Sequence, residues 1–303
     1  MSKTFKDRLK ASCKSCTKGT IKAYLSNIRR AKRLYDGDPE LPSTGTWLNS
    51  AKLKHKIRGL PLNVRRNITS ALLVAARTYK IDEKYWYTRM IEDAAKYQEK
   101  RKQNKKSAYE EKHLPESFDK LKKKTTEYKR TLKLDFTSPP TLSNLYKIQW
   151  WVILRLIQEL PFRNDLPTIN VKAKKGNHLL KHGKQFKIKM TEFKNSDKIG
   201  PREIILGKKN SRMLKQFLAY RDKCGVKHDL LFSLRNGDPM TRSAFSQGLI
   251  NLTQKLLGGK RVGTRLIRVL FATENREEIE KAQDVTNRLL HTSEQTKQYI
   301  RKD

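Results

Sequence analysis

Two segments near the C-terminal end contain residue types that can act on a phosphate group. Residues 263–273 include Arg265 and Arg268, and farther along come His291 and, eight positions later, Tyr299. A planar guanidinium binds two phosphate oxygens at once and keeps its charge. A tyrosine hydroxyl can serve as a nucleophile that forms a covalent intermediate. These residue types are suited to breaking a phosphodiester without a metal ion.

The order of these residues resembles the tyrosine recombinases, the phage integrase family. Arg268 and the following Phe271-Ala272-Thr273 match the family's box, in which His or Lys, two spacer residues and Arg open a helix. Leu289-Leu290-His291 is similar to the family's Leu-Gly-His-Ser-like step. The resemblance implies that Arg268 clamps the phosphate, that His291 hydrogen-bonds a phosphate oxygen, and that Tyr299 attacks phosphorus.

Three further residues, Arg163, Lys194 and Arg265, stand in the same order along the chain as site residues of the family. Arg163 comes after Leu160-Pro161-Phe162, where the family carries its first arginine in a Thr-Gly-Leu-Arg-like turn, and Pro161-Phe162 departs from that pattern. Lys194 resembles the family's hairpin lysine, the general acid toward the leaving oxygen, and Lys198 is the alternative. Arg265 stands where the family has His or Lys. Arginine can donate hydrogen bonds to the phosphate there but cannot shuttle a proton.

The resemblance implies a site-specific DNA recombinase, or integrase, that uses no cofactor and no metal ion. Its tyrosine would form a 3′-phosphotyrosyl bond and release a 5′ hydroxyl, so that the bond energy is kept for rejoining. It also implies a homotetramer on paired DNA sites. The departures suggest a divergent member from a eukaryotic virus or mobile element. Two alternatives stay open: a type IB DNA topoisomerase-like enzyme, and a non-enzymatic basic nucleic-acid-binding protein in which Tyr299 is structural.

The charge of the chain predicts a polyanionic partner. There are 68 Lys and Arg residues against 30 Asp and Glu, a formal charge of +38 over 303 residues. Such an excess attracts phosphates over a long range, and with the resemblance it predicts double-stranded DNA as the partner. The candidate DNA-binding residues are basic positions on predicted helices and in the basic run that follows them: Lys22, Arg29, Arg30, Arg33, Arg65, Arg66, Lys105 and Lys106.

Neither a membrane segment nor a secretory signal is expected. The sequence lacks a long apolar run, and its first residues lack the apolar middle of a signal peptide. We expect a soluble intracellular protein, in the host nucleus, a viral factory or a virion if its origin is viral. Cys13, Cys16 and Cys224 cannot build a disulfide framework, which fits a reducing compartment. A lone C-x-x-C does not supply the four ligands of a structural zinc site.

The elements that must position these residues follow from apolar periodicity and capping signals. Residues 1–16 are predicted to form a basic arm, 17–104 a helical domain that clamps DNA, 105–113 a basic linker, and 114–303 the catalytic domain. The helices predicted in the first domain cover residues 17–35, 47–57, 61–79 and 82–102.

The second domain is predicted to be mostly helical with one hairpin. Residues 185–206 alternate apolar and charged positions around a turn, which is typical of two short strands. The fold class is therefore mainly α with a small antiparallel β-sheet. The predicted helices cover residues 115–132, 142–160, 209–222, 241–257, 264–274 and 277–290.

Overall fold

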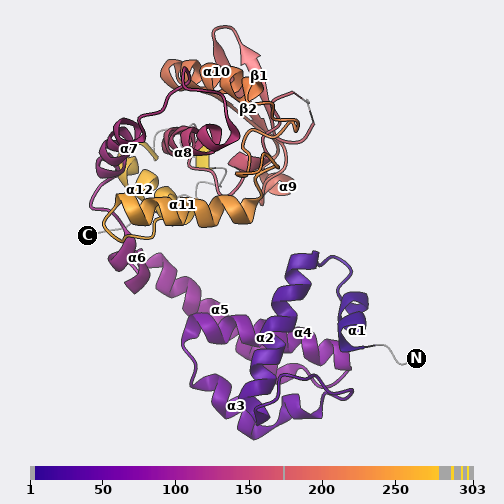
Figure 1. The fold of residues 1–303 in the computed structure, drawn as a ribbon. Coiled ribbons are helices and arrows are strands. Elements are labelled where there is room, and N and C mark those ends of the chain that lie inside the picture. Colours follow the sequence, from indigo (N-terminus) through magenta and orange to yellow (C-terminus); the bar gives the residue numbers. More distant parts are fainter. Residues whose placement is uncertain (1–3, 173–174, 280–287, 290–294, 296–298, 300–303) are drawn as a thin grey trace. The chain divides into compact units, whose positions relative to one another are not determined.

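The computed structural model describes residues 4–172, 175–279, 288–289, 295 and 299. The chain divides into two compact units, Met1–Gln103 and Asn104–Asp303 (Figure 1). Each unit has a hydrophobic core of its own. None of the helices described is long and apolar enough to cross a membrane.

The first unit is built from helices. Thr17 caps α2 by accepting a hydrogen bond from the Thr20 N–H, and Gly37 ends the helix with left-handed backbone. α4 packs against α1, α2 and α5. The helices predicted between residues 17 and 102 are confirmed. The elements are α1 (Phe5–Ser12), α2 (Lys18–Asp36), the 3-10 helix η1 (Thr46–Asn49), α3 (Ala51–Arg58), α4 (Leu62–Tyr79) and α5 (Lys84–Lys102).

The segment predicted as a basic arm differs from that expectation, because residues 5–12 form α1 and pack on the first core. Leu9 is fully buried, and the ring of Phe5 stacks on Tyr79 with centroids 4.6 Å apart. The two apolar residues are four positions apart, which places them on one helix face. The sequence predicts no disulfide framework, and the structure has one disulfide after α1, between Cys13 and Cys16, whose Cα atoms are 5.4 Å apart.

The second unit surrounds the buried helix α8. This helix packs against α7, α10 and α12. Its apolar residues are almost all inaccessible to solvent, as the wide apolar face of the sequence predicts. The helical elements are α6 (Ala108–His113), α7 (Phe118–Leu132), α8 (Leu142–Glu159), the 3-10 helix η2 (Leu166–Thr168), α9 (Ser196–Ile199), α10 (Lys208–Lys223), α11 (Arg242–Leu256), α12 (Thr264–Glu274) and α13 (Arg276–Ile279).

One antiparallel sheet, in the order β1-β2-β3, completes the second unit. Its strands are β1 (His178–His182), β2 (Gln185–Met190) and β3 (Arg202–Ile205). β2 and β3 are the predicted hairpin, joined by residues 191–201, which include α9. β1 was not predicted. The fold class, mainly α with a small antiparallel sheet, is confirmed. Most of the helix predicted over 277–290 lies outside the described residues.

The basic linker predicted over 105–113 is in large part a packed element of the second unit. Ser107 and Glu110 form a capping box at the start of α6, and Glu110 is only 1% exposed. His113, at the end of α6, is also buried and accepts a hydrogen bond at Nδ1 from the Arg261 N–H. The dense charge of this segment led to the prediction of a linker, whereas residues 108–113 form a short helix. Its buried polar residues have partners inside the second unit.

Candidate functional site

Arg163 lies in the turn that follows the buried helix α8. The residues before it, Leu160 and Phe162, are fully buried, so the backbone entering the turn is anchored in the core. Arg163 itself is half-buried and lines a hollow of about 530 Å³. A half-buried guanidinium beside a solvent-filled hollow is placed to meet an anion from outside.

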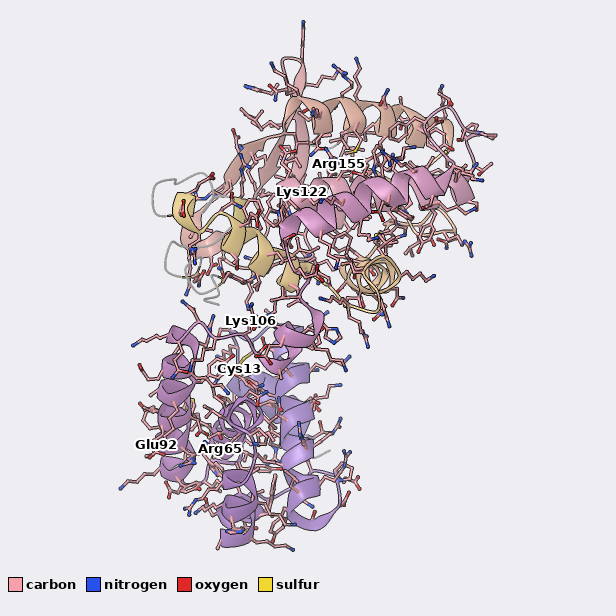
Figure 2. All side chains as sticks on the ribbon, turned by 90° about the vertical axis from the view of Figure 1, so that its left-hand side faces the viewer. Cys13, Arg65, Glu92, Lys106, Lys122 and Arg155 are labelled. Carbon is pink, nitrogen blue, oxygen red and sulfur yellow. A yellow bond between two sulfur atoms is a disulfide. The ribbon has the colours of Figure 1, made fainter. Side chains whose placement is uncertain are left out.

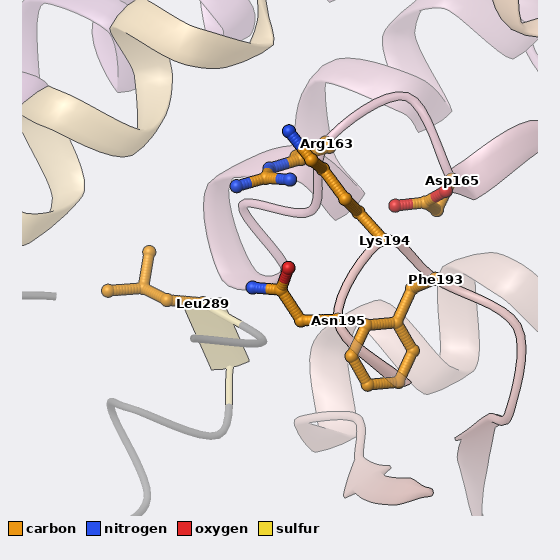
Figure 3. A pocket seen from close by; sticks show the side chains of 6 residues that line it. All are labelled: Arg163, Asp165, Phe193, Lys194, Asn195 and Leu289. Carbon is orange, nitrogen blue, oxygen red and sulfur yellow. The ribbon is translucent and has the colours of Figure 1, made fainter. Parts of the chain in front are cut away.

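Lys194 lines the same hollow from the connection between β2 and β3. Figure 3 shows Arg163, Lys194 and Asp165 among the side chains that line a smaller pocket, and the same three residues also line the hollow. Lys194 is exposed to solvent, so its flexible stem can move its ammonium group within the hollow. Lys198, the alternative, lies on α9 and is not among the residues that line the hollow. The geometry therefore favours Lys194 over Lys198.

Arg268 is buried beside Tyr299. Its side chain, on α12, is 1% exposed, and Nη2 donates a hydrogen bond of 2.8 Å to the Leu289 carbonyl. The guanidinium carbon lies 4.8 Å from the centre of the Tyr299 ring. Burial, together with the positive charge of Arg163, lowers the pKa of Arg268 to about 10, while Tyr299 and Asp165 act in the opposite direction. Arg268 remains protonated at neutral pH.

Asn164 and Asp165 connect the Arg163 turn with two other helices. Asp165 Oδ1 accepts a hydrogen bond of 2.9 Å from Arg242 Nη2 at the start of α11. Burial raises the pKa of Asp165, while the charges of Arg242, Arg163 and Arg268 act in the opposite direction. Beside it, Asn164 Oδ1 accepts a hydrogen bond from the hydroxyl of Thr264, the first residue of α12. The turn that carries Arg163 and the helix that carries Arg268 are thus bonded directly to each other.

The Lys194 segment is also bonded to the C-terminal segment. Asn195 Nδ2 donates a hydrogen bond of 3.0 Å to Gln295 Oε1. Tyr299 is half-buried and packs against the core of the second unit. Arg163, Lys194, Arg268 and Tyr299, which lie on four separate segments, therefore belong to one region of the second unit.

Two predicted site residues are not placed in this region. Arg265 is exposed, and its Nη2 donates a hydrogen bond of 2.9 Å to Glu110 Oε1 of α6. It does not line the hollow that Arg163 and Lys194 share. His291 lies outside the described residues. The pairing of Arg265 needs the tertiary structure, because 155 positions separate it from Glu110.

The sequence did not identify two residues of the site. Arg242 lines the hollow together with Arg163, and Asn195 lines a smaller pocket together with Arg163 and Lys194. Asp165 lies two positions from Arg163, yet it accepts a hydrogen bond from Arg242, 77 positions away. No local signal marks such a pair. Within the described ranges, no group of three His, Cys, Asp or Glu residues is arranged to hold a metal ion.

A second candidate surface lies in the first unit, where α1 and α2 border a groove of about 1100 Å³. Its floor includes Ile21 and Leu25, and none of the residues that line it is acidic. Four of the predicted DNA-binding residues line this groove, and α1 with its following loop adds others. The basic residues of the groove are Lys6, Lys10, Lys14, Lys18, Lys22, Arg29, Arg30 and Arg33.

The other predicted DNA-binding residues have different surroundings. Arg65, labelled in Figure 2, is mostly buried. It forms a two-pronged ion pair with Asp93, which is fully buried. Arg66 stacks over the Tyr97 ring at 4.2 Å and lines a separate hollow with Arg30. Lys105 and Lys106 are exposed. Arg65 is thus engaged inside the first unit rather than on its surface.

Comparison with known proteins identifies the fold. No protein-family model and no curated protein matches the sequence. The XerH site-specific recombinase bound to its difH substrate, in a pre-cleavage complex, matches with a TM-score of 0.61 and 16% identity, covering 100% of this chain and 82% of XerH. The post-cleavage complex on a palindromic difH substrate matches with a TM-score of 0.60 and 16% identity over 98% of this chain and 81% of that chain. The likeness shows a shared fold, the tyrosine-recombinase fold that the sequence motifs predict.

Proposed function

We propose that this protein is a site-specific DNA recombinase that cleaves and rejoins strands through a covalent 3′-phosphotyrosyl intermediate. The observation that carries the proposal is the convergence of Arg163, Lys194, Arg268 and Tyr299 in one region of the second unit. These residues come from a turn, a strand connection, a helix and the C-terminal segment. Two of them, Arg163 and Lys194, line an open hollow, and the other two, Arg268 and Tyr299, lie against each other.

In the proposed reaction, the Tyr299 hydroxyl oxygen attacks the scissile phosphorus. An O–P bond forms to the tyrosine while the bond from phosphorus to the 5′ oxygen breaks, and the phenol proton passes to water. The leaving oxygen takes a proton from the Lys194 ammonium group, which water then reprotonates. The products are a 3′-phosphotyrosine and a free 5′ hydroxyl. Attack by a 5′ hydroxyl from another strand reverses the step and joins the two DNA molecules.

The two arginines would stabilise the charge that develops on the non-bridging oxygens. Preorganised donors of this kind contribute roughly 10²–10³-fold in rate each. Arg163 faces the hollow, and Arg268 is held by Leu289 close to the nucleophile. Their positions are set before the DNA arrives, so little reorganisation accompanies the reaction. We include His291 as a further phosphate contact on the resemblance alone.

Arg265 has a different proposed role. Its hydrogen bond to the buried Glu110 connects α12 with α6, and an arginine cannot give up its proton near neutral pH. We propose that Arg265 holds α12, which carries Arg268, against α6 through this ion pair and takes no part in proton transfer. The proton for the leaving group would then come from Lys194 alone.

We further propose that the groove between α1 and α2 binds the DNA backbone. It combines eight basic residues with no acidic one, and phosphate contacts of this kind supply most of the sequence-independent affinity for DNA. The exposed Lys105 and Lys106 would add to the same attraction. A homotetramer on paired sites and an origin in a virus or mobile element remain predictions from the resemblance.

The test is trapping of the covalent intermediate. Purified protein is incubated with a pool of DNA duplexes of random sequence, each with a nick beside the candidate scissile phosphate. After cleavage, the short fragment that carries the 5′ hydroxyl diffuses away, so the strands cannot be rejoined. Protein–DNA adducts that survive denaturant are then recovered and sequenced. We expect adducts with a shared sequence from the wild type and none from Tyr299→Phe.

Tyr146→Phe is the matched control, because Tyr146 is a half-buried tyrosine of the same unit that packs edge-on against Trp150. It should keep full adduct formation. An adduct that persists in Tyr299→Phe would refute the assignment of the nucleophile. A wild type that forms no adduct and binds DNA with a steep salt dependence would favour the non-enzymatic alternative. Relaxation of supercoiled plasmid without paired sites would favour the topoisomerase alternative.

A further inference from the structure

The side-chain amide of Asn177 is buried between the two segments that carry Arg163 and Lys194. Asn177 comes immediately before β1 and is 2% exposed. An asparagine amide offers two N–H donors and a carbonyl oxygen with two lone pairs. All four of these positions are used, and every one of the bonds measures 2.8 Å.

On one side, Asn177 holds the segment that follows Arg163. Its Nδ2 donates to the hydroxyl oxygen of Thr168, the last residue of η2. The Thr168 hydroxyl in turn donates a hydrogen bond of 2.7 Å to the main-chain carbonyl of Asp165. This chain of bonds reaches the turn that presents Arg163, because Asp165 is only two residues farther along.

On the other side, Asn177 holds the start of the Lys194 segment. Its Oδ1 accepts hydrogen bonds from the N–H groups of Thr191 and Glu192, and its Nδ2 donates to the Glu192 carbonyl. These contacts fix the backbone directly after β2. Lys194 follows two residues later, so its starting point is set by the same amide that holds the Arg163 turn.

The backbone next to Asn177 is shaped for this contact. Gly176 has a φ of +61°, a conformation that other residues rarely adopt. A Cβ at this position would lie 3.3 Å from the Glu192 carboxylate. Neither of the other amide or acid side chains can replace Asn177, since glutamine is longer and aspartate has no N–H donor. The bridge therefore depends on this residue type at this position.

We infer that Asn177 is a positioning residue that sets Lys194 relative to Arg163. The inference rests on the proposed function, in which Lys194 protonates the leaving oxygen. Asn177 does not itself touch the DNA. Without Asn177, the Lys194 segment can move away from the Arg163 turn. Proton transfer from Lys194 to the leaving 5′ oxygen then becomes slower, while Arg163 still binds the phosphate.

The test compares two leaving groups in single-turnover cleavage of the site recovered by adduct trapping. One substrate has the natural 5′ oxygen, and the other has sulfur in that bridging position. A thiolate leaves without a proton because a thiol is a far stronger acid than an alcohol. General acid catalysis contributes about 10²–10⁴-fold. We expect Asn177→Ala to slow cleavage of the oxygen substrate about 10-fold or more, within that range, and to cleave the sulfur substrate as fast as the wild type does.

Two further variants distinguish the loss of these hydrogen bonds from a general folding defect. Asn177→Asp keeps the acceptor side of the amide, and Thr168→Val cuts the bridge from its other end. Both should show a smaller loss that sulfur also restores. Gln149→Ala is the matched control, because Gln149 is a buried amide that bonds the Ser233 main chain elsewhere in the unit. Sulfur should restore none of the activity that this variant loses.

Lys194→Ala and Arg163→Ala distinguish a failure of the role inferred for Asn177 from a failure of the role proposed for Lys194. Sulfur should rescue the first and leave the second slow. If Lys194→Ala is rescued and the Asn177 variants are not, the inference about Asn177 is overturned while the proposed function stands. If Lys194→Ala is not rescued, the general acid has been assigned wrongly and the inference falls with that assignment.

Discussion

Replacing Arg268 with lysine tests the buried arginine most directly. In the folded protein, Arg268 Nη2 donates a hydrogen bond of 2.8 Å to the Leu289 carbonyl. Its guanidinium carbon lies 4.8 Å from the centre of the Tyr299 ring. A lysine keeps the positive charge but has no planar fork. It cannot hold the Leu289 carbonyl and a phosphate oxygen with the same geometry.

The expected losses differ in size for stability and for rate. One hydrogen bond from a charged donor to a buried carbonyl is lost, which lowers the free energy of unfolding by about 2 kcal/mol. For a unit of this size, that corresponds to a fall in Tm of about 4–8 °C. Loss of one preorganised donor to the transition state slows cleavage roughly 10²–10³-fold. The effect on rate should thus far exceed the effect on the folded fraction.

Arg221→Lys is the matched control. Arg221 is fully buried in the same unit and donates hydrogen bonds to the carbonyls of His228 and Leu230. It should lose a similar amount of stability in thermal unfolding and keep the single-turnover cleavage rate of the wild type. Equal losses of rate in the two variants would refute the reasoning, because the Arg268 effect would then come from the fold alone.

Three further predictions concern charge. Asp165→Asn should gain stability relative to the wild type as the pH rises above 3.8, because burial raises the pKa of Asp165 and the protonated form stabilises the fold only at low pH. Arg65→Ala should lower the free energy of unfolding by about 3 kcal/mol, since it leaves the buried Asp93 charge poorly compensated. Replacing Lys18 and Lys22 by Ala should reduce the slope of log K for DNA against log salt by about 1.8, roughly 0.9 for each phosphate contact.

Each of these measurements has its own control. A stability difference between Asp165→Asn and the wild type that stays constant across pH would contradict the assigned pKa direction. Arg66→Ala should cost less than Arg65→Ala in chemical denaturation, because Arg66 stacks on Tyr97 without a buried acid. Replacing two exposed lysines of α5 that do not line the groove should leave the salt slope unchanged; these are Lys84 and Lys96.

Much of the secondary structure could be predicted because its causes are local. Thr17 and Thr141 each accept a hydrogen bond from a backbone N–H in the first turn of the helix they precede, and both starts are visible in the sequence. Among the missed elements, α1, α6 and β1 are all short, and α1 and α6 are also rich in charge. Their apolar residues are too few to produce a clear period, so tertiary contacts rather than local preference decide them.

The charge, the helical character of both units, and the linear motifs around Arg163, Lys194, Arg268 and Tyr299 can all be read from the sequence alone. Which of the candidate cations are engaged inside a unit becomes visible only once the elements have packed. Arg65 and Arg265 look like other surface cations in the sequence, yet each bonds a buried carboxylate that is distant along the chain. The tertiary structure also placed Asn177 between the Arg163 and Lys194 segments. The physical reason is that periodicity reports which face of an element is buried, whereas a hydrogen bond between distant residues depends on how the elements pack.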